Sequence, residues 1–227
     1  MSIILGLETS TKICSVAVSD GDKLLALREE GGEYSHSEKL TVFIQSTLKE
    51  ARLKLPDIDA VAVSKGPGSY TGLRIGVSVA KGLCYALNKP LIAVDTLQAM
   101  ALGMSKAEDL GLYCAMIDAR RMEVYTAIYD LNNNMIEEVS AKIIDKDSFE
   151  NYLKENKVVF FGDGSDKCKE VLNGNTNATF SDKGLPSAQY INQIALEKFN
   201  CQNFEDVAYF EPYYLKDFIA TTPKKLL

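Results

Sequence analysis

The chain is poor in the side chains that catalytic and metal sites most often use. Its 227 residues include a single histidine, His36, and no Gly-Lys-Ser/Thr or G-x-S-x-G motif. One imidazole cannot supply the histidine pairs typical of metal sites, and it is the only histidine base for a serine or cysteine nucleophile. We therefore expect no catalytic residue and no metal site, and we expect His36 to be an exposed residue at the start of a helix.

Positive charge and long apolar runs are also scarce. The 25 Lys and Arg residues are outnumbered by 31 Asp and Glu, which gives a net charge of -6. Domains that bind nucleic acid by themselves are usually basic, so any action on nucleic acid should pass through a partner. No apolar stretch approaches the roughly 20 residues of a membrane span, and no basic segment precedes an N-terminal apolar run. We expect neither a membrane segment nor a signal peptide.

The five cysteines are scattered, odd in number and never spaced C-x-x-C. Four of them lie in apolar runs. Such a pattern favours buried, reduced thiols over a disulfide framework or a zinc site. It predicts a cytoplasmic protein.

What the chain does contain is one order of elements that occurs twice. Alternating and continuous apolar runs predict strands, and apolar residues at helical spacing, such as those from Leu40 to Ala51, predict helices. The first half reads as strands 3–7, 13–19 and 23–28, a helix opened by a capping box at 35–38, strand 60–64, a helix ending near 87, and strand 91–94. The second half reads as strands 112–117, 123–129 and 135–144, helix 147–156, strand 158–161, and a later helix 188–199.

Two β-β-β-α-β units in succession predict an α/β protein with two lobes and a cleft between them. Each lobe should hold a mixed sheet with helices on its faces. We place the boundary between residues 104 and 105, with an N-terminal lobe 1–104 and a C-terminal lobe 105–227. Residues 173–182 are polar and lack a clear period, so we expect the second lobe to be reduced and its sheet to be shorter.

The glycine-rich segment 66–76, GPGSYTGLRIG, links a predicted strand to a predicted helix. A strand, a glycine-rich turn and a helix can present backbone N–H groups to an anion. The glycines at 66, 68 and 72 miss the G-x-G-x-x-G spacing by one residue, and the Walker A lysine is missing. The spacing therefore argues against a phosphate-binding loop.

The helix that follows carries more apolar surface than one core can easily use. From residue 73 to residue 87 its polar members form one narrow stripe: Arg74, Ser78, Lys81 and Tyr85. Small residues recur at four-residue spacing, although glycine inside a helix costs about 1 kcal/mol relative to alanine. Either the helix is buried entirely within its own lobe, or it packs on its sheet and also contacts a partner protein. For the second alternative, the candidate contact residues are Gly72, Leu73, Gly76, Val79, Ala80 and Leu83, with Phe43 and Thr47 from the preceding helix.

At this point the sequence resembles a known family. Segment 66–76 resembles the signature of the TsaB (YeaZ) family. Residues 7–11 with 14–17, residues 117–120 with 123–125, and residues 212–215 also match. The family more often has Asp where this chain has Glu8. The resemblance covers nearly the whole chain.

The resemblance implies a two-lobed fold related to actin and Hsp70, the ASKHA fold built from duplicated RNase H-like units. It implies a non-catalytic dimerisation subunit that pairs, through the helices of its N-terminal lobe, with the catalytic paralogue TsaD. The ATPase TsaE joins the pair. The complex transfers a threonylcarbamoyl group to N6 of the adenosine beside the anticodon, in tRNAs that read codons starting with A. The subunit would then meet tRNA only indirectly, and its helix face could also self-associate when the partner is absent.

ATP chemistry remains the alternative, as in a small acyl- or sugar-kinase-like ATPase of the same fold. Active members hold phosphate between two hairpin turns whose small residues let the backbone approach closely. Glu8, Thr9 and Ser10 form the first turn and a candidate vestigial phosphate site. The second turn, 118–122, has three bulky residues and no glycine. We expect no tight ATP binding and no cofactor. Four carboxylates could meet at the cleft or act only as turn and cap residues: Glu8, Asp95, Asp118 and Asp163.

Overall fold

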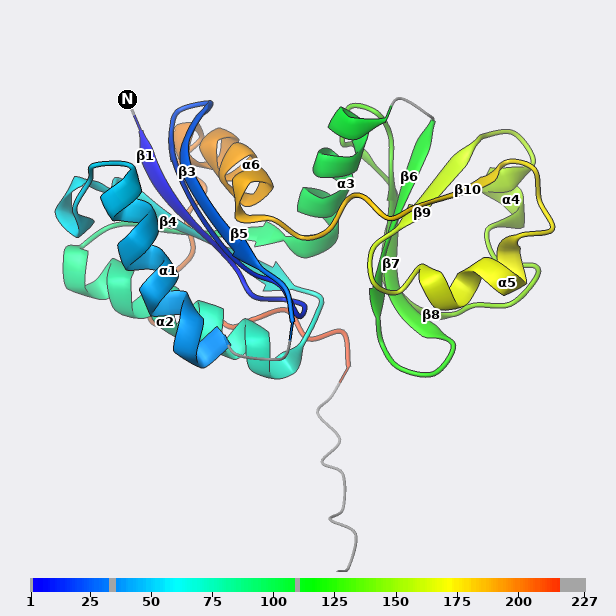
Figure 1. Ribbon diagram of the computed structural model, residues 1–227, viewed down its shortest axis with the longest axis horizontal. Helices are drawn as coiled ribbons and strands as arrows, with labels where there is room; N and C mark the ends of the chain where they lie inside the picture. Colours follow the sequence, from blue (N-terminus) through cyan, green and yellow to red (C-terminus); the bar gives the residue numbers. More distant parts are fainter. Residues whose placement is uncertain (1, 33–35, 109–110, 217–227) are drawn as a thin grey trace, which may run out of the picture.

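The computed structural model describes residues 2–32, 36–108 and 111–216, and it contains two lobes, each built on a five-stranded sheet (Figure 1). The first sheet has the order β3-β2-β1-β4-β5 and the second the order β10-β9-β6-β7-β8. In both, an antiparallel meander of three strands is extended by two parallel strands. The predicted two-lobed α/β fold is confirmed.

The strands of the first sheet are β1 (Ile3–Glu8), β2 (Cys14–Asp20), β3 (Lys23–Glu30), β4 (Ala60–Gly66) and β5 (Leu91–Asp95). Strand β1 is central and both of its faces are covered, which explains its nearly continuous apolar sequence. Leu5 lies opposite Val18 of β2 and Val61 of β4. Successive residues point to opposite faces, so Leu5 joins one core and Ile4 the other.

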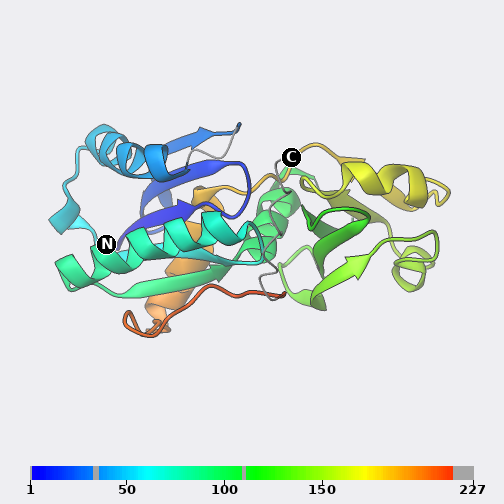
Figure 2. The same cartoon turned by 90° about the horizontal axis from the view of Figure 1, so that it is seen from below.

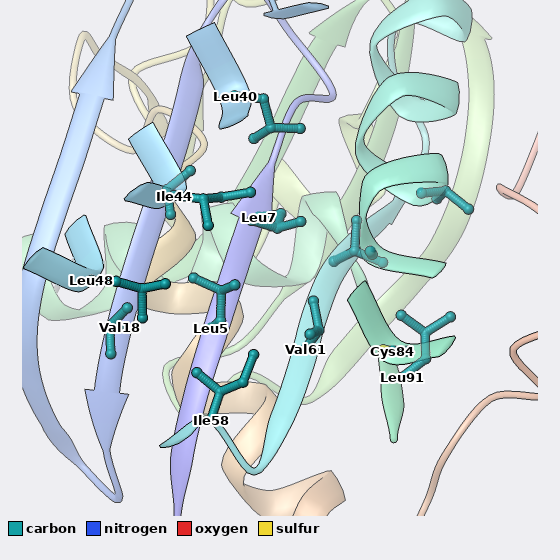
Figure 3. Close-up of a cluster of buried hydrophobic side chains, with 14 of the residues drawn as sticks. Leu5, Leu7, Val18, Leu40, Ile44, Leu48, Ile58, Val61, Cys84 and Leu91 are labelled. Atoms are coloured by element: carbon teal, nitrogen blue, oxygen red, sulfur yellow. The ribbon is translucent and has the colours of Figure 1, made fainter. Parts of the chain in front are cut away.

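Helices α1 (His36–Glu50) and α2 (Tyr70–Leu87) cover one face of the first sheet. Leu40, Ile44 and Leu48 point from α1 toward the strands, at the spacing that places them on one side of a helix (Figure 3). Cys84 of α2 packs into the same cluster. The predicted capping box at 35–38 lies partly outside the described residues.

The other face of each sheet is covered by a helix from the opposite half of the chain. Helix α6 (Ala188–Asn200) packs on β1, β2, β4 and β5, where Ile191 and Ala195 join the core of the first lobe. Helix α3 (Thr96–Ala107) packs mainly on β6 and β7, where Leu97 and Met100 join the core of the second lobe. The division at residues 104 and 105 is therefore corrected. The first lobe contains α6, whereas α3 packs mainly on the second sheet and also places Ala99 in the core of the first lobe.

The second sheet consists of β6 (Leu112–Asp118), β7 (Glu123–Tyr129), β8 (Met135–Ile143), β9 (Val158–Phe161) and β10 (Ala178–Ser181). The expectation of a shorter second sheet is wrong, because residues 178–181 form a fifth strand parallel to β9. The reduction lies in the helices of this lobe. Within the described residues, the outer face of this lobe carries two short helices, α4 (Glu150–Leu153) and α5 (Lys169–Leu172), and the 3-10 turn η2 (Asp166–Cys168). A second 3-10 turn, η1 (Leu55–Asp57), lies in the first lobe. The predicted helix 147–156 forms only over the four residues of α4.

After α6 the chain returns along the first lobe and reaches the second. Residues 203–216 run beside β5 and α2 and then toward the β6–β7 region (Figures 1 and 2, orange to red). Across the described part of the chain, no helix combines the length and the apolar character that crossing a bilayer requires.

Candidate functional site: the interlobe cleft and helix α2

A cleft of about 830 Å³ lies between the two lobes. The first lobe contributes the turn after β1 and the glycine-rich segment, and the second contributes the β6–β7 turn. Residues 213–216 line it as well. From the sequence, these two turns are the places where a phosphate could be held, so their geometry tests that expectation.

The first turn is closed by the chain itself. Glu8, Thr9 and Ser10 are all fully buried. The glycine-rich segment lies directly on them: Ser69 N donates to Ser10 O at 2.6 Å, and Thr9 Oγ1 donates to Gly72 O at 2.8 Å. Glu8 and Thr9 are therefore not open to the cleft, because segment 66–72 and the start of α2 lie on them. Ser10 still lines the cleft, so a vestigial phosphate site stays a prediction at this residue only.

This contact explains the glycines of the motif. A Cβ atom at Gly68 would overlap Ser10 O, one at Gly72 would overlap Thr9 O, and one at Gly76 would overlap Thr9 Oγ1. Only a residue without a side chain permits such close approach. Gly72 and Gly76 thus serve packing inside the first lobe. The helix is nevertheless not buried entirely within its own lobe, because Val79, Gly82 and Leu83 are partly or fully exposed, and the contact with a partner stays a prediction.

Glu8 uses the backbone group that a phosphate would need. Its Oε1 accepts a hydrogen bond of 2.6 Å from Ser10 N. Burial raises the pKa of the Glu8 carboxyl, and hydrogen bonds from Ser10 oppose this only in part. Ser64, the neighbouring residue on β4, is fully buried as well. The end of β1 is a closed polar cluster within the first lobe.

The second turn is also internally bonded. Ala119 N donates to Glu123 O and Arg120 N donates to Asp118 Oδ1, at 3.1 and 2.9 Å. Arg120 and Arg121 adopt positive φ angles of 72° and 53°, and their side chains are exposed. The turn therefore presents arginine side chains to the cleft, whereas several of its backbone N–H groups are already used.

Two of the four carboxylates named from the sequence line the cleft. Asp163 Oδ1 accepts a hydrogen bond from Asp118 N at 3.0 Å, and Asp118 is paired with Lys167. Asp95 instead forms an ion pair of 2.8 Å with Lys65. In the described ranges 2–32, 36–108 and 111–216, no group of three His, Cys, Asp or Glu side chains is placed to hold a metal ion.

His36 differs from the expectation. Its side chain is only 3% exposed, and Nε2 lies 2.7 Å from Thr11 O. It borders the cleft behind Ser37 and contacts the glycine-rich helix start at Gly72. The prediction of an exposed residue is wrong because the imidazole is part of the packing that holds the first turn.

The proposed partner-contact residues divide into two groups. Five are buried within the first lobe and offer no surface: Gly72, Leu73, Gly76, Ala80 and Thr47. Their assignment to an interface is corrected, since they pack on β1, β4 and the first turn. Phe43, Val79 and Leu83 are partly exposed and remain candidates.

The outer face of α2 contains exposed positions that the sequence did not single out as contacts. Gly82 is exposed, and a Cβ atom there would meet nothing within 4 Å. Tyr85 is 86% exposed. The sequence placed Tyr85 on the polar side of the helix, which correctly indicates exposure. A polar position does not show whether an exposed side chain faces solvent or a partner.

Comparisons with known proteins agree with this architecture. Residues 30–224 match the family model "TsaD: tRNA N6-adenosine threonylcarbamoyltransferase". The chain is 32% identical, over 224 residues and 96% of each chain, to the tRNA threonylcarbamoyladenosine biosynthesis protein TsaB of Escherichia coli K12. A Pseudomonas aeruginosa crystal structure, described as similar to peptidase YEAZ, has a TM-score of 0.85 at 27% identity. It covers 95% of this chain and 100% of its own.

A more distant structure shows the fold alone. The activator of 2-hydroxyisocaproyl-CoA dehydratase from Clostridium difficile, with bound ADPNP, has a TM-score of 0.51 at 10% identity. It covers 90% of this chain and 98% of its own. The two-lobed fold is therefore shared with that activator. The match to the family model over residues 30–224 and the identity to the Escherichia coli protein show that the chain belongs to the TsaB (YeaZ) family.

Proposed function

We propose that this chain is a non-catalytic subunit of the complex that transfers a threonylcarbamoyl group to N6 of the adenosine beside the anticodon in tRNAs reading codons that start with A. A TsaD-like paralogue would supply the catalytic site and a TsaE-like ATPase would join the pair. The observation that carries the proposal is the closed first turn. The glycine-rich segment packs directly on the turn after β1, so Glu8 and Thr9 are not available to a ligand in the cleft.

The remaining chemistry supports a subunit without its own catalytic centre. The single histidine lies at the edge of the cleft, buried with Nε2 2.7 Å from Thr11 O, and the chain has no second histidine to act with it. The net charge of -6 disfavours direct tRNA binding, which the partner would then provide. No cofactor is needed for this role, and the cytoplasm is the compartment that it requires.

The partner surface in this proposal is the outer side of α1 and α2. Phe43, Val79 and Leu83 are partly exposed beside the core that both helices share. Val42, 57% exposed, extends the apolar surface on α1. Apolar side chains surrounded by polar ones are typical of the centre and rim of protein interfaces. In the absence of the partner, the same surface would serve for self-association.

The surface can be tested with a substitution that the isolated chain should tolerate. Gly82→Glu adds a charged side chain where nothing lies within 4 Å, so it should not disturb the packing of the isolated chain. We expect loss of co-elution with the TsaD homologue, with a thermal unfolding temperature no lower than that of the parent, because glutamate is a better helix former than glycine. Gly174→Glu is the matched control, because Gly174 also has open space and lies in the second lobe. Equal binding by both variants would contradict the assignment of α2 to the interface.

The role is tested by reconstitution with TsaD and TsaE homologues and tRNA. We expect modification to be lost when this chain is omitted and to return when it is added. Full modification without it would refute the proposal. Calorimetric titration with Mg-ATP tests the kinase-like alternative, since micromolar affinity accompanied by turnover would contradict a non-catalytic role.

A further inference from the structure

The segment that follows α6 is held to the first lobe along its length. Glu205 N donates to Leu91 O of β5 at 2.9 Å. Lys81 of α2 then donates from Nζ to Ala208 O at 3.0 Å and to Phe210 O at 2.9 Å. The Phe210 side chain packs against the core beneath α2. A charged side chain of α2 therefore fixes the path of a segment more than 120 residues away in sequence.

The last described residues of this segment pass from one lobe to the other. Tyr213 N donates to Lys65 O of β4 at 2.7 Å, and the Tyr214 ring lies 4.9 Å from the Tyr70 ring at the start of α2. Both belong to the first lobe. Two residues later, Lys216 forms an ion pair with Glu123 of β7 in the second lobe.

The two lobes are also joined on a different side. Helices α3 and α6 pack together there, and Lys106 of α3 donates to Gln193 of α6. Figure 1 places these helices above the red segment. Residues 213–216 line the cleft, whereas its lining includes no residue of α3 or α6. A connection on one side leaves the lobes able to rock about it, and a second connection across the cleft restricts that motion.

We propose that residues 203–216 form a strap that holds the two lobes at a fixed angle across the cleft and ties that angle to helix α2. Within residues 203–216, Lys216 is the residue that holds the segment to the second lobe, through a partly exposed ion pair with Glu123 and through Nζ, which lies 6.0 Å from the centroid of the Tyr125 ring. Such contacts are individually weak. The strap can therefore release without unfolding either lobe. This inference concerns the isolated chain and does not depend on the proposed function.

The test measures the distance between the lobes by pulsed electron paramagnetic resonance. Spin labels are attached to Gln45→Cys on α1 and Glu155→Cys after α4, two exposed positions, in a Cys201→Ser background that removes the exposed thiol. The other four cysteines are buried. The parent should give one narrow distance distribution. Lys216→Met, Tyr214→Ala and a chain ending at Glu211 should each broaden it and add longer distances.

Two control variants change residues 203–216 or the chain after them but keep the contacts of residues 213–216 with both lobes. A chain ending at Lys216 retains every strap contact described above. Tyr209→Ala changes a strap tyrosine that is 85% exposed, as a match for Tyr214→Ala. Both should keep the narrow distribution of the parent.

Each outcome bears on one part of the proposal. If Lys216→Met and Tyr214→Ala both retain the distance distribution of the parent, the strap does not set the angle between the lobes. These two substitutions test the proposal even if the chain ending at Glu211 fails to fold. Lys81→Met tests the tie to α2 and should also broaden the distribution. A narrow distribution in Lys81→Met would refute that tie while leaving the crossing in place. No partner is present in these measurements, so their failure is distinct from failure of the proposed function.

Discussion

At the scale of single residues, helix α2 contains two kinds of glycine. Gly76 faces Thr9 and is buried, whereas Gly82 faces open space. The sequence could not separate them, because both interrupt the helix in the same way and differ only in what lies opposite. The contact of Gly76 depends on a turn more than 60 residues earlier in the chain.

Replacing each glycine by alanine should change stability in opposite directions. Gly76→Ala overlaps Thr9 Oγ1, and overpacking costs about 1–3 kcal/mol, of which the better helix propensity returns about 1 kcal/mol. We expect a lower free energy of unfolding. Gly82→Ala should raise it by about 1 kcal/mol, since only the propensity changes. Urea unfolding of both variants measures this, and equal stabilisation would show that Gly76 is not tightly packed.

Glu8 should make stability depend on pH. Burial raises the pKa of the folded carboxyl above the ordinary 4.5. At a pH between the pKa of Glu8 in the unfolded chain and its higher pKa in the folded chain, the folded chain keeps a proton that the unfolded chain has released. The free energy of unfolding therefore falls as pH rises through this range. Glu8→Gln cannot release that proton. We expect the stability of Glu8→Gln relative to the parent to increase from pH 5 to pH 8.

Urea unfolding at both pH values measures this difference. The free energy of unfolding of the parent should fall by about 1.4 kcal/mol for each pH unit between the two pKa values of Glu8. Glu155→Gln is the control, because Glu155 is exposed in the second lobe. It should leave the profile of the parent unchanged. A difference between Glu8→Gln and the parent that is the same at pH 5 and pH 8 would contradict a raised pKa of the Glu8 carboxyl.

At the scale of elements, local patterns predicted most strands and the long helices, because periodicity reports which face of an element is buried. Pattern alone does not say which sheet buries that face. Helix α6 follows β10 in sequence yet packs on the first sheet, where Asn192 donates to Ile4 O and Ala17 O. The boundary at 104 and 105 failed for this reason. Strand β10 was missed because its residues are only partly buried at a sheet edge.

The candidate site was predictable in part. The repeated pattern predicted a cleft between two lobes, and Asp118 and Asp163, two of the four carboxylates named from the sequence, line it. The apolar excess of α2 left open whether the helix is buried in its own lobe or also contacts a partner. The sequence did not reveal that α2 makes two further internal contacts, one to the first turn and one, through Lys81, to residues 208–210. Long-range contacts of this kind follow from topology and not from residue spacing.

At the scale of the whole molecule, the exchange of α3 and α6 should make the two lobes unfold together. Unfolding the second lobe removes the sheet on which Leu97 and Met100 are buried. It also leaves α6 without its contact to α3, and because α6 packs on the first sheet, the first lobe is destabilised as well. A shared element between two cores is expected to produce one cooperative transition, where independent domains would give two.

The cysteines report on each lobe separately. Cys84 is buried in the first lobe and Cys168 in the second, and burial raises the pKa of both thiols, that of Cys84 to about 11. Both should resist a brief pulse of thiol reagent until their lobe opens. We expect them to become reactive at the same urea concentration in pulse labelling read by mass spectrometry. Exposed Cys201 should react throughout and controls for reagent activity. Labelling of Cys168 at a distinctly lower urea concentration than Cys84 would mean that the second lobe opens alone and that the exchanged helices do not couple the two cores.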